Sequence, residues 1–63
     1  MARVKVKTPK KHIVYMEFHN YLGDVTEVDD IAIFYSANRA TQYEAWCKQN
    51  EDDKFVTYGI RVV

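Results

Sequence analysis

The side chains best suited to chemistry in this chain are two histidines and one cysteine. His12 and His19 are seven residues apart, which is not the i, i+4 spacing of a metal-binding pair on a helix. Cys47 has no histidine near it in the sequence, and a nucleophilic thiol needs a base or another group that lowers its pKa. We therefore expect two surface histidines on a strand and one small, packed thiol.

Two pairs of adjacent carboxylates, Asp29–Asp30 and Asp52–Asp53, are the next candidates. Neighbouring side chains on a helix diverge by about 100°, so neither pair is suited to joint acid–base chemistry. Acids are also favoured at helix starts and turns for structural reasons. The sequence has no glycine-rich phosphate loop and no Cys-x-x-Cys pair. These features predict a protein that is not an enzyme and that needs no metal or other cofactor.

Length and composition predict one small domain, residues 1–63. The chain is 48% hydrophobic and 29% charged, which is globular composition, and its size is near the lower limit for folding without a disulfide or metal. Its single cysteine excludes an internal disulfide, as is typical of a reducing cytoplasm. No apolar run approaches the roughly 18 residues that span a bilayer. We expect a cytoplasmic protein that does not bind membranes.

Alternating residue types predict two strands before residue 22. Residues 2–8 form one such segment, in which Val4 and Val6 alternate with Arg3, Lys5 and Lys7, as is typical of a half-buried strand with a basic outer face. A turn at Pro9 would lead into a second strand over residues 12–21, so that residues 3–21 form a hairpin. The side of the second strand predicted to face the core carries Val14, Met16 and Phe18.

A helix is predicted over residues 26–49. Thr26 and Asp29 resemble a capping box, and acids gather at the expected positive end of the helix. Either this helix is continuous and apolar on two sides, or it breaks near residues 36–38, where Ser36 or Asn38 would cap a second helix. Residues 31–35 also suit a strand, but we favour a helix because acids precede them and a long helical pattern follows.

A last strand is predicted over residues 55–63, and its inward side carries Val56, Tyr58, Ile60 and Val62. The element order predicts an α+β fold, a two-layer β-β-α-β sandwich in which one helix covers one face of a three-stranded antiparallel sheet.

Charge and aromatic content favour a protein partner over nucleic acid. Residues 1–12 carry a charge of +5 and residues 13–63 a charge of −5, so the net charge is zero, and general nucleic-acid binders need a basic surface. Tyrosine and tryptophan are favoured anchors at protein interfaces, and a helix that is apolar on two sides has one side free for a partner. Single-stranded nucleic-acid binding stays open, through basic and aromatic side chains on the outer sheet face.

Four short stretches of the sequence resemble the Dmd antitoxins of T-even-type bacteriophages. They are RVKVK at the start, DDIAIF at residues 29–34, Ala45-x-x-Lys48, and DDKFV at residues 52–56. With one gap before the last strand, the similarity extends over most of the chain. It implies a phage antitoxin that binds a host ribonuclease toxin of the RnlA or LsoA type in the infected cell. By blocking the toxin's active-site groove, such a protein protects phage mRNA, and it needs no cofactor.

The resemblance also implies where the toxin would bind. Acids would replace the phosphates of RNA, and Phe34 is the nearest equivalent of an anchoring aromatic, where a tryptophan is expected. Two further aromatics predicted on the helix complete the partner-binding set, which is Asp29, Asp30, Phe34, Tyr43, Trp46, Asp52 and Asp53. Another phage-encoded inhibitor of a host defence protein remains an alternative. The free protein is expected to be a monomer or a weak homodimer.

Overall fold

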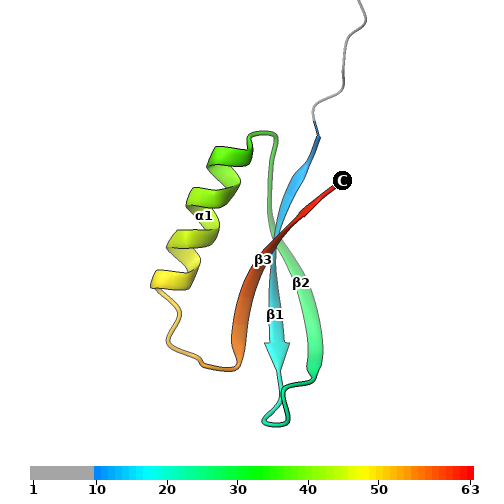
Figure 1. Ribbon diagram of the computed structural model, residues 1–63, viewed down its shortest axis with the longest axis vertical. Coiled ribbons are helices and arrows are strands. Elements are labelled where there is room, and N and C mark those ends of the chain that lie inside the picture. The colour runs from blue at the N-terminus through cyan, green and yellow to red at the C-terminus, as the bar shows by residue number, and fades with distance from the viewer. Residues whose placement is uncertain (1–9) are drawn as a thin grey trace, which may run out of the picture.

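The computed structural model describes residues 10–63, which form three strands and one helix in the order β-β-α-β. These elements are β1 (His12–His19), β2 (Val25–Phe34), α1 (Ala37–Gln49) and β3 (Val56–Val62). The strands make one antiparallel sheet in the order β2-β1-β3, and α1 lies against one face of it (Figure 1). The predicted α+β class, with one helix on a three-stranded antiparallel sheet, is confirmed. No helix within residues 10–63 is long and apolar enough to cross a membrane.

The hairpin of the structure joins β1 to β2. In its turn, the Asn20 side chain accepts hydrogen bonds from the backbone N–H groups of Leu22 (2.9 Å) and Asp24 (3.0 Å). Gly23 has a φ of 90°, a conformation that favours glycine. Because β2 and β3 occupy both edges of β1, the predicted hairpin over residues 3–21 is wrong, and β1 ends at His19. The predicted strand over residues 2–8 lies outside the described residues.

The first half of the predicted helix over residues 26–49 is also wrong, because residues 25–34 form β2. Valine, isoleucine and threonine dominate this stretch and favour a strand. Thr26 does not cap a helix, since its hydroxyl donates to the carbonyl of Phe18 (3.2 Å). The helix begins after Ser36, whose Oγ accepts from the N–H of Arg39 (3.4 Å). Ser36 as the cap of a helix that begins near residues 36–38 is therefore confirmed, whereas the helix predicted before it is a strand.

The core between α1 and the sheet is built from small side chains. Val14 is completely buried at its centre, and Ala40 and Cys47 are the buried residues of α1. The packed thiol predicted for Cys47 is confirmed. The cross-strand register puts the predicted inward residues of β1 and β3 on the same face of the sheet, that of Val14. Ile13, on the opposite face, is buried as well.

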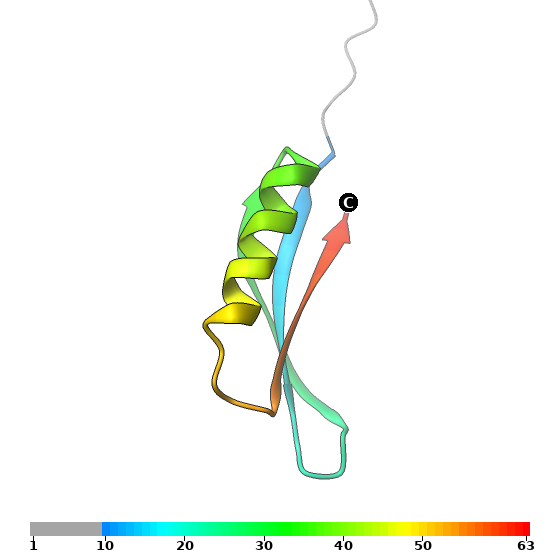
Figure 2. The same cartoon turned by 60° about the vertical axis from the view of Figure 1, so that its left-hand side comes forward.

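The hairpin extends beyond the end of the helix. Figures 1 and 2 show α1 over the half of the sheet near the start of β1, while the β1–β2 turn projects past it. We call the sheet face under α1 the helix side and the opposite face the open side. An irregularity in the register leaves Ile31 without a partner, since Val14 pairs with Ala32 and Tyr15 pairs with Asp30. This bulge adds one residue to β2.

The position of the helix start can be tested by removing the Ser36 cap. We expect Ser36→Ala to lower the free energy of unfolding by about 1 kcal/mol, because the N–H of Arg39 loses its acceptor. Asn38→Ala is the control, since Asn38 lies inside the first turn, where alanine is the better helix former. Urea unfolding followed by circular dichroism measures both. Equal losses for the two variants would contradict Ser36 as the cap.

Candidate protein-binding surface

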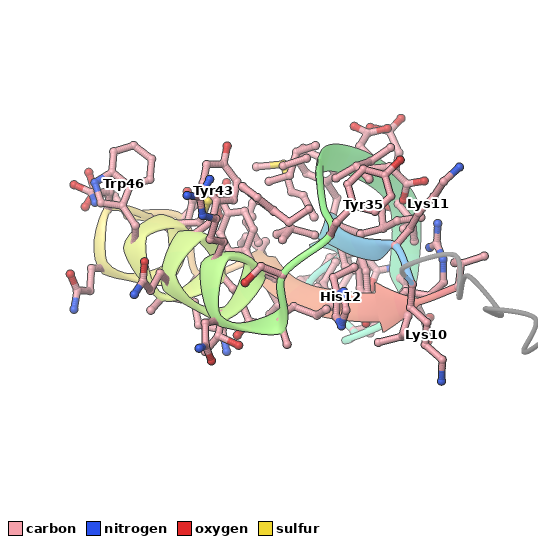
Figure 3. All side chains as sticks on the ribbon, turned by 90° about the horizontal axis from the view of Figure 1, so that it is seen from above. Lys10, Lys11, His12, Tyr35, Tyr43 and Trp46 are labelled. Carbon is pink, nitrogen blue, oxygen red and sulfur yellow. The ribbon has the colours of Figure 1, made fainter. Side chains whose placement is uncertain are left out.

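Three aromatic side chains from two elements form a row beside the helix. Phe34 is the last residue of β2, and Tyr43 and Trp46 lie one turn apart on α1. The ring centroids of Phe34 and Tyr43 are 5.5 Å apart, and those of Tyr43 and Trp46 are 6.2 Å apart and stacked. Figure 3 shows Tyr43 and Trp46 pointing from the same side of α1. We call these three residues the aromatic row.

The row becomes more exposed from the strand outward. Phe34 and Tyr43 are half-buried, whereas Trp46 is 59% exposed. Two shallow hollows of about 400 and 490 Å³ adjoin Phe34, and Arg39 lines both. Tyr43 stacks on Trp46, and an indole has few rotatable bonds, so Trp46 offers a large surface at a small cost in conformational freedom. This arrangement is suited to protein recognition.

All three aromatic residues were predicted to bind a partner, and the structure brings them together. Phe34 was expected on the helix, however, and it lies on β2. The two-residue connection of Tyr35 and Ser36 turns the chain from β2 directly into α1, which places Phe34 beside Tyr43. Sequence reasoning missed this contact because a helix over residues 26–49 would carry Phe34 and Tyr43 more than two turns apart.

The four aspartates of the predicted site do not gather in one patch. Asp29 pairs with Met16 and so lies on the helix side of β2, where it is exposed. Asp30 lies on the open side, and its carboxylate is 2.8 Å from the Arg61 guanidinium of β3. Arg61 in turn lies over the Tyr15 ring, 5.9 Å from its centroid. Asp30 is therefore part of a cross-sheet cluster on the face opposite the helix.

Asp52 and Asp53 lie in the connection between α1 and β3. The carboxylate of Asp53 accepts from the N–H of Phe55 (2.8 Å), and its own N–H donates to the carboxylate of Glu51 (3.1 Å). Asp53 thus shapes the turn into β3, while Asp52 is exposed. Since β1 separates β2 from β3, these acids and those of β2 belong to different parts of the surface.

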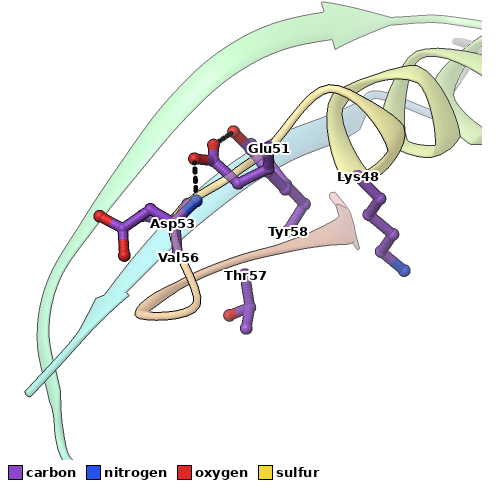
Figure 4. Close-up of a pocket in the computed structure, with 6 residues that line it drawn as sticks. All are labelled: Lys48, Glu51, Asp53, Val56, Thr57 and Tyr58. Atoms are coloured by element: carbon purple, nitrogen blue, oxygen red, sulfur yellow. Dashed lines mark hydrogen bonds between the residues drawn. The ribbon is translucent and has the colours of Figure 1, made fainter. Parts of the chain in front are cut away.

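A pocket of about 380 Å³ lies where α1 ends beside β3 (Figure 4). The Tyr58 hydroxyl donates to the Glu51 carboxylate in this pocket. This hydrogen bond, with burial and the negative charge of Glu51, raises the pKa of Tyr58 to about 12. Lys48, also in the lining, is 3.4 Å from Glu44 on the same helix. The Tyr58–Glu51 bond ties the α1–β3 connection to the sheet, and no sequence motif indicated it.

The two histidines lie on opposite faces of the sheet. His19 Nε2 is 2.8 Å from the Thr57 hydroxyl on the open side. His12 lies on the helix side and is half-buried, with its Nδ1 buried and without a hydrogen-bond partner. Residues 10–63 contain no group of three or more histidine, cysteine or acidic side chains placed to hold a metal ion.

Comparisons of the chain with protein-family models, with curated proteins and with solved structures find no match. The resemblance to the Dmd antitoxins therefore remains a prediction from the sequence. In the structure, the aromatic row is the feature that suits a binding surface.

The Tyr58–Glu51 bond makes stability depend on pH in the alkaline range. The pKa of Tyr58 is about 12 in the folded protein and near the ordinary tyrosine value of 10.0 in the unfolded chain. Because folding raises this pKa, its stabilising contribution is fully present below pH 10 and is lost as the pH rises through about 12. We expect wild type to lose more stability than Tyr58→Phe across this interval, as measured by urea unfolding.

Glu51→Gln is the companion variant, because it keeps the shape of the side chain and removes the charge. In an ultraviolet titration of tyrosinate it should move the highest tyrosine pKa back toward 10.0. If wild type shows no tyrosine that ionises late, the hydrogen bond is not formed in solution.

Proposed function

We propose that the protein is an antitoxin-type inhibitor that binds a bacterial ribonuclease toxin through the aromatic row and keeps RNA from the toxin's catalytic residues. The observation that carries this proposal is Trp46, which is 59% exposed although it stacks on Tyr43. Small domains seldom expose large aromatic side chains in contiguous patches without a partner for them. The identity of the partner comes from the resemblance of the sequence to the Dmd antitoxins.

The charges around the aromatic row favour protein over nucleic acid as the ligand. Proteins that bind single strands combine stacking aromatics with a basic groove. Arg39 is the one basic residue in the two hollows beside Phe34. On the open side, the charge of Arg61 is offset by Asp30, whose carboxylate is 2.8 Å from the guanidinium. Residues 10–63 carry six basic and nine acidic side chains, a net charge of −3.

Inhibition by direct contact is tighter when the binding surface is already ordered before the partner arrives. Phe34 and Tyr43 hold the base of the row through ring contacts, and Ser36 fixes the start of the helix that carries Tyr43 and Trp46. A surface prepared in this way spends less binding energy on ordering its own side chains. Because occlusion involves no bond making or breaking, the proposal requires no catalytic group and no cofactor.

Replacing Trp46, the most exposed residue of the aromatic row, tests the proposal. We expect Trp46→Ala to weaken binding to a purified RnlA- or LsoA-type toxin by roughly 30-fold or more, the loss typical of a central aromatic anchor. Isothermal titration calorimetry measures the affinity, and cleavage of a labelled RNA measures inhibition. Tyr21→Ala is the matched control, because Tyr21 is an aromatic residue of the hairpin turn that is 84% exposed.

Thermal unfolding of both variants must accompany the binding data, and it should change little because both side chains are largely exposed. Wild-type affinity in Trp46→Ala would overturn the assignment of the row as the binding surface. A pull-down from bacterial lysate, with and without ribonuclease treatment, tests the class of partner. Recovery of a ribonuclease toxin from both samples supports the proposal, and recovery of RNA alone favours single-stranded nucleic-acid binding.

A further inference from the structure

The half of β2 nearer the hairpin turn has its apolar side turned away from the helix. Asp29 and Glu27 lie on the helix side. Val28 and Val25 lie on the open side, where each is 48% exposed. A strand of an antiparallel sheet with one solvated face normally turns its polar residues outward and its apolar residues toward the core. This half of β2 does the reverse, so its open side has the composition of a surface that is covered.

The bulge at Ile31 causes this reversal. Without the extra residue, Val28 would lie on the helix side, because side chains alternate along a strand. Ile33, on the other side of the bulge, also lies on the open side and is 56% exposed. We call Ile33, Val28 and Val25 the open-side stripe. It is interrupted by Asp30, whose carboxylate is held in an ion pair.

Two charged side chains of the open side make no ion pair within residues 10–63. Lys11 precedes β1 and pairs with Val63 through two backbone hydrogen bonds of 3.2 and 2.9 Å, which continue the sheet by one residue. Because it is two residues from Ile13, it lies on the same side of the sheet, and it is exposed. Glu17 lies on that side toward the other end of β1. The open side therefore has a positive end and a negative end.

A second copy can pack its open side onto this one in two symmetric ways. If the two β1 strands run in the same direction, Lys11 meets Lys11 and Glu17 meets Glu17 of the second copy, and like charges across an interface are unfavourable. If they run in opposite directions about a two-fold axis near Val14, Lys11 of each copy meets Glu17 of the other. Pairing along the outer edges of β2 is disfavoured, because Glu27 and Asp29 would oppose each other there.

We propose that the open side of the sheet is a homodimer interface, in which two copies pack face to face with their β1 strands antiparallel. The open-side stripes of the two copies then cover each other. The face has three strands of up to about eight residues, roughly 14 Å by 26 Å. This is less than the roughly 800 Å² that each partner buries in a standard interface, so the dimer dissociates in the micromolar to millimolar range. Trp46 and Tyr43 lie on α1, across the sheet from this face, and the inference is independent of the proposed function.

Sedimentation equilibrium of the full chain, from micromolar to millimolar concentration, tests the dimer. Lys11→Glu and Glu17→Lys should each raise the dissociation constant roughly tenfold or more, because like charges then meet across the interface. Combining both changes in one chain restores opposite charges and should return the constant to near its wild-type value. Lys10→Glu is the matched control, since Lys10 carries the same charge and points away from Lys11 (Figure 3). Circular dichroism checks that each variant is folded.

Two further variants locate the interface on the open side. Val28→Thr keeps a β-branched side chain in the strand but removes apolar contact area, and it should weaken the dimer severalfold. Asp29→Lys, on the helix side, should leave the dissociation constant unchanged. A tighter dimer in Asp29→Lys would assign the contact to the edges of β2 and overturn the proposal. A wild-type chain that is monomeric at millimolar concentration would also overturn it, as would a double variant that stays as weak as the single ones.

Discussion

The contact between α1 and the sheet passes through small side chains, and most of the surface follows from that constraint. Ala40 and Cys47 let the helix backbone approach closely above Val14, the one fully buried large side chain in the described residues. Trp46 lies outside this layer. Burial of apolar area, the main source of stability in folding, is modest in this domain.

Because little apolar area is buried, the polar contacts at the edges of this layer contribute a larger share of the stability. On one margin, Tyr58 and Glu51 fasten the α1–β3 connection to β3. On the open side, the Tyr15 ring lies directly against Gly59, where any larger residue would collide with it. Arg61 covers that ring and reaches across β1 to Asp30. These contacts join β2, β1 and β3 on a face that no helix covers, and they account for the half-buried state of Tyr15.

Regular alternation in the sequence predicted β1 and β3. The prediction failed in β2, where nearby acids and the helical pattern that follows both favoured a helix. The alternating valines and aromatics of β1 and β3 identified both strands and their inward faces correctly. In β2, three acids close together resembled the first turn of a helix, while the β-branched residues around them pointed to a strand. The acids instead occupy an edge strand. Ser36 was a weaker local signal than these acids, yet it marks the true start of the helix.

Three of the seven residues predicted to bind a partner lie together in the structure, but their contact was not predicted. Tyr43 and Trp46 were selected from the sequence because aromatic residues are favoured anchors at interfaces, and Phe34 was selected through the resemblance to the Dmd antitoxins. Their contact depends on the turn at Tyr35 and Ser36 and could not be derived while residues 26–36 were assigned to a helix. The four aspartates were grouped because their chemistry is similar. That similarity gave no information on how far apart they lie in the folded protein. Residue type indicates what a side chain can do, whereas topology decides which side chains act together.

The bulge at Ile31 has a consequence for how this strand can change in length. On either side of it, β2 is in phase with β1: Ala32 lies opposite Val14, and Asp30 lies opposite Tyr15. Elsewhere in a strand, losing one residue reverses the inward and outward faces of everything beyond it. At Ile31, loss of the extra residue leaves both halves in their present alignment. This position is therefore a point in β2 where evolution can shorten the chain without rebuilding the core.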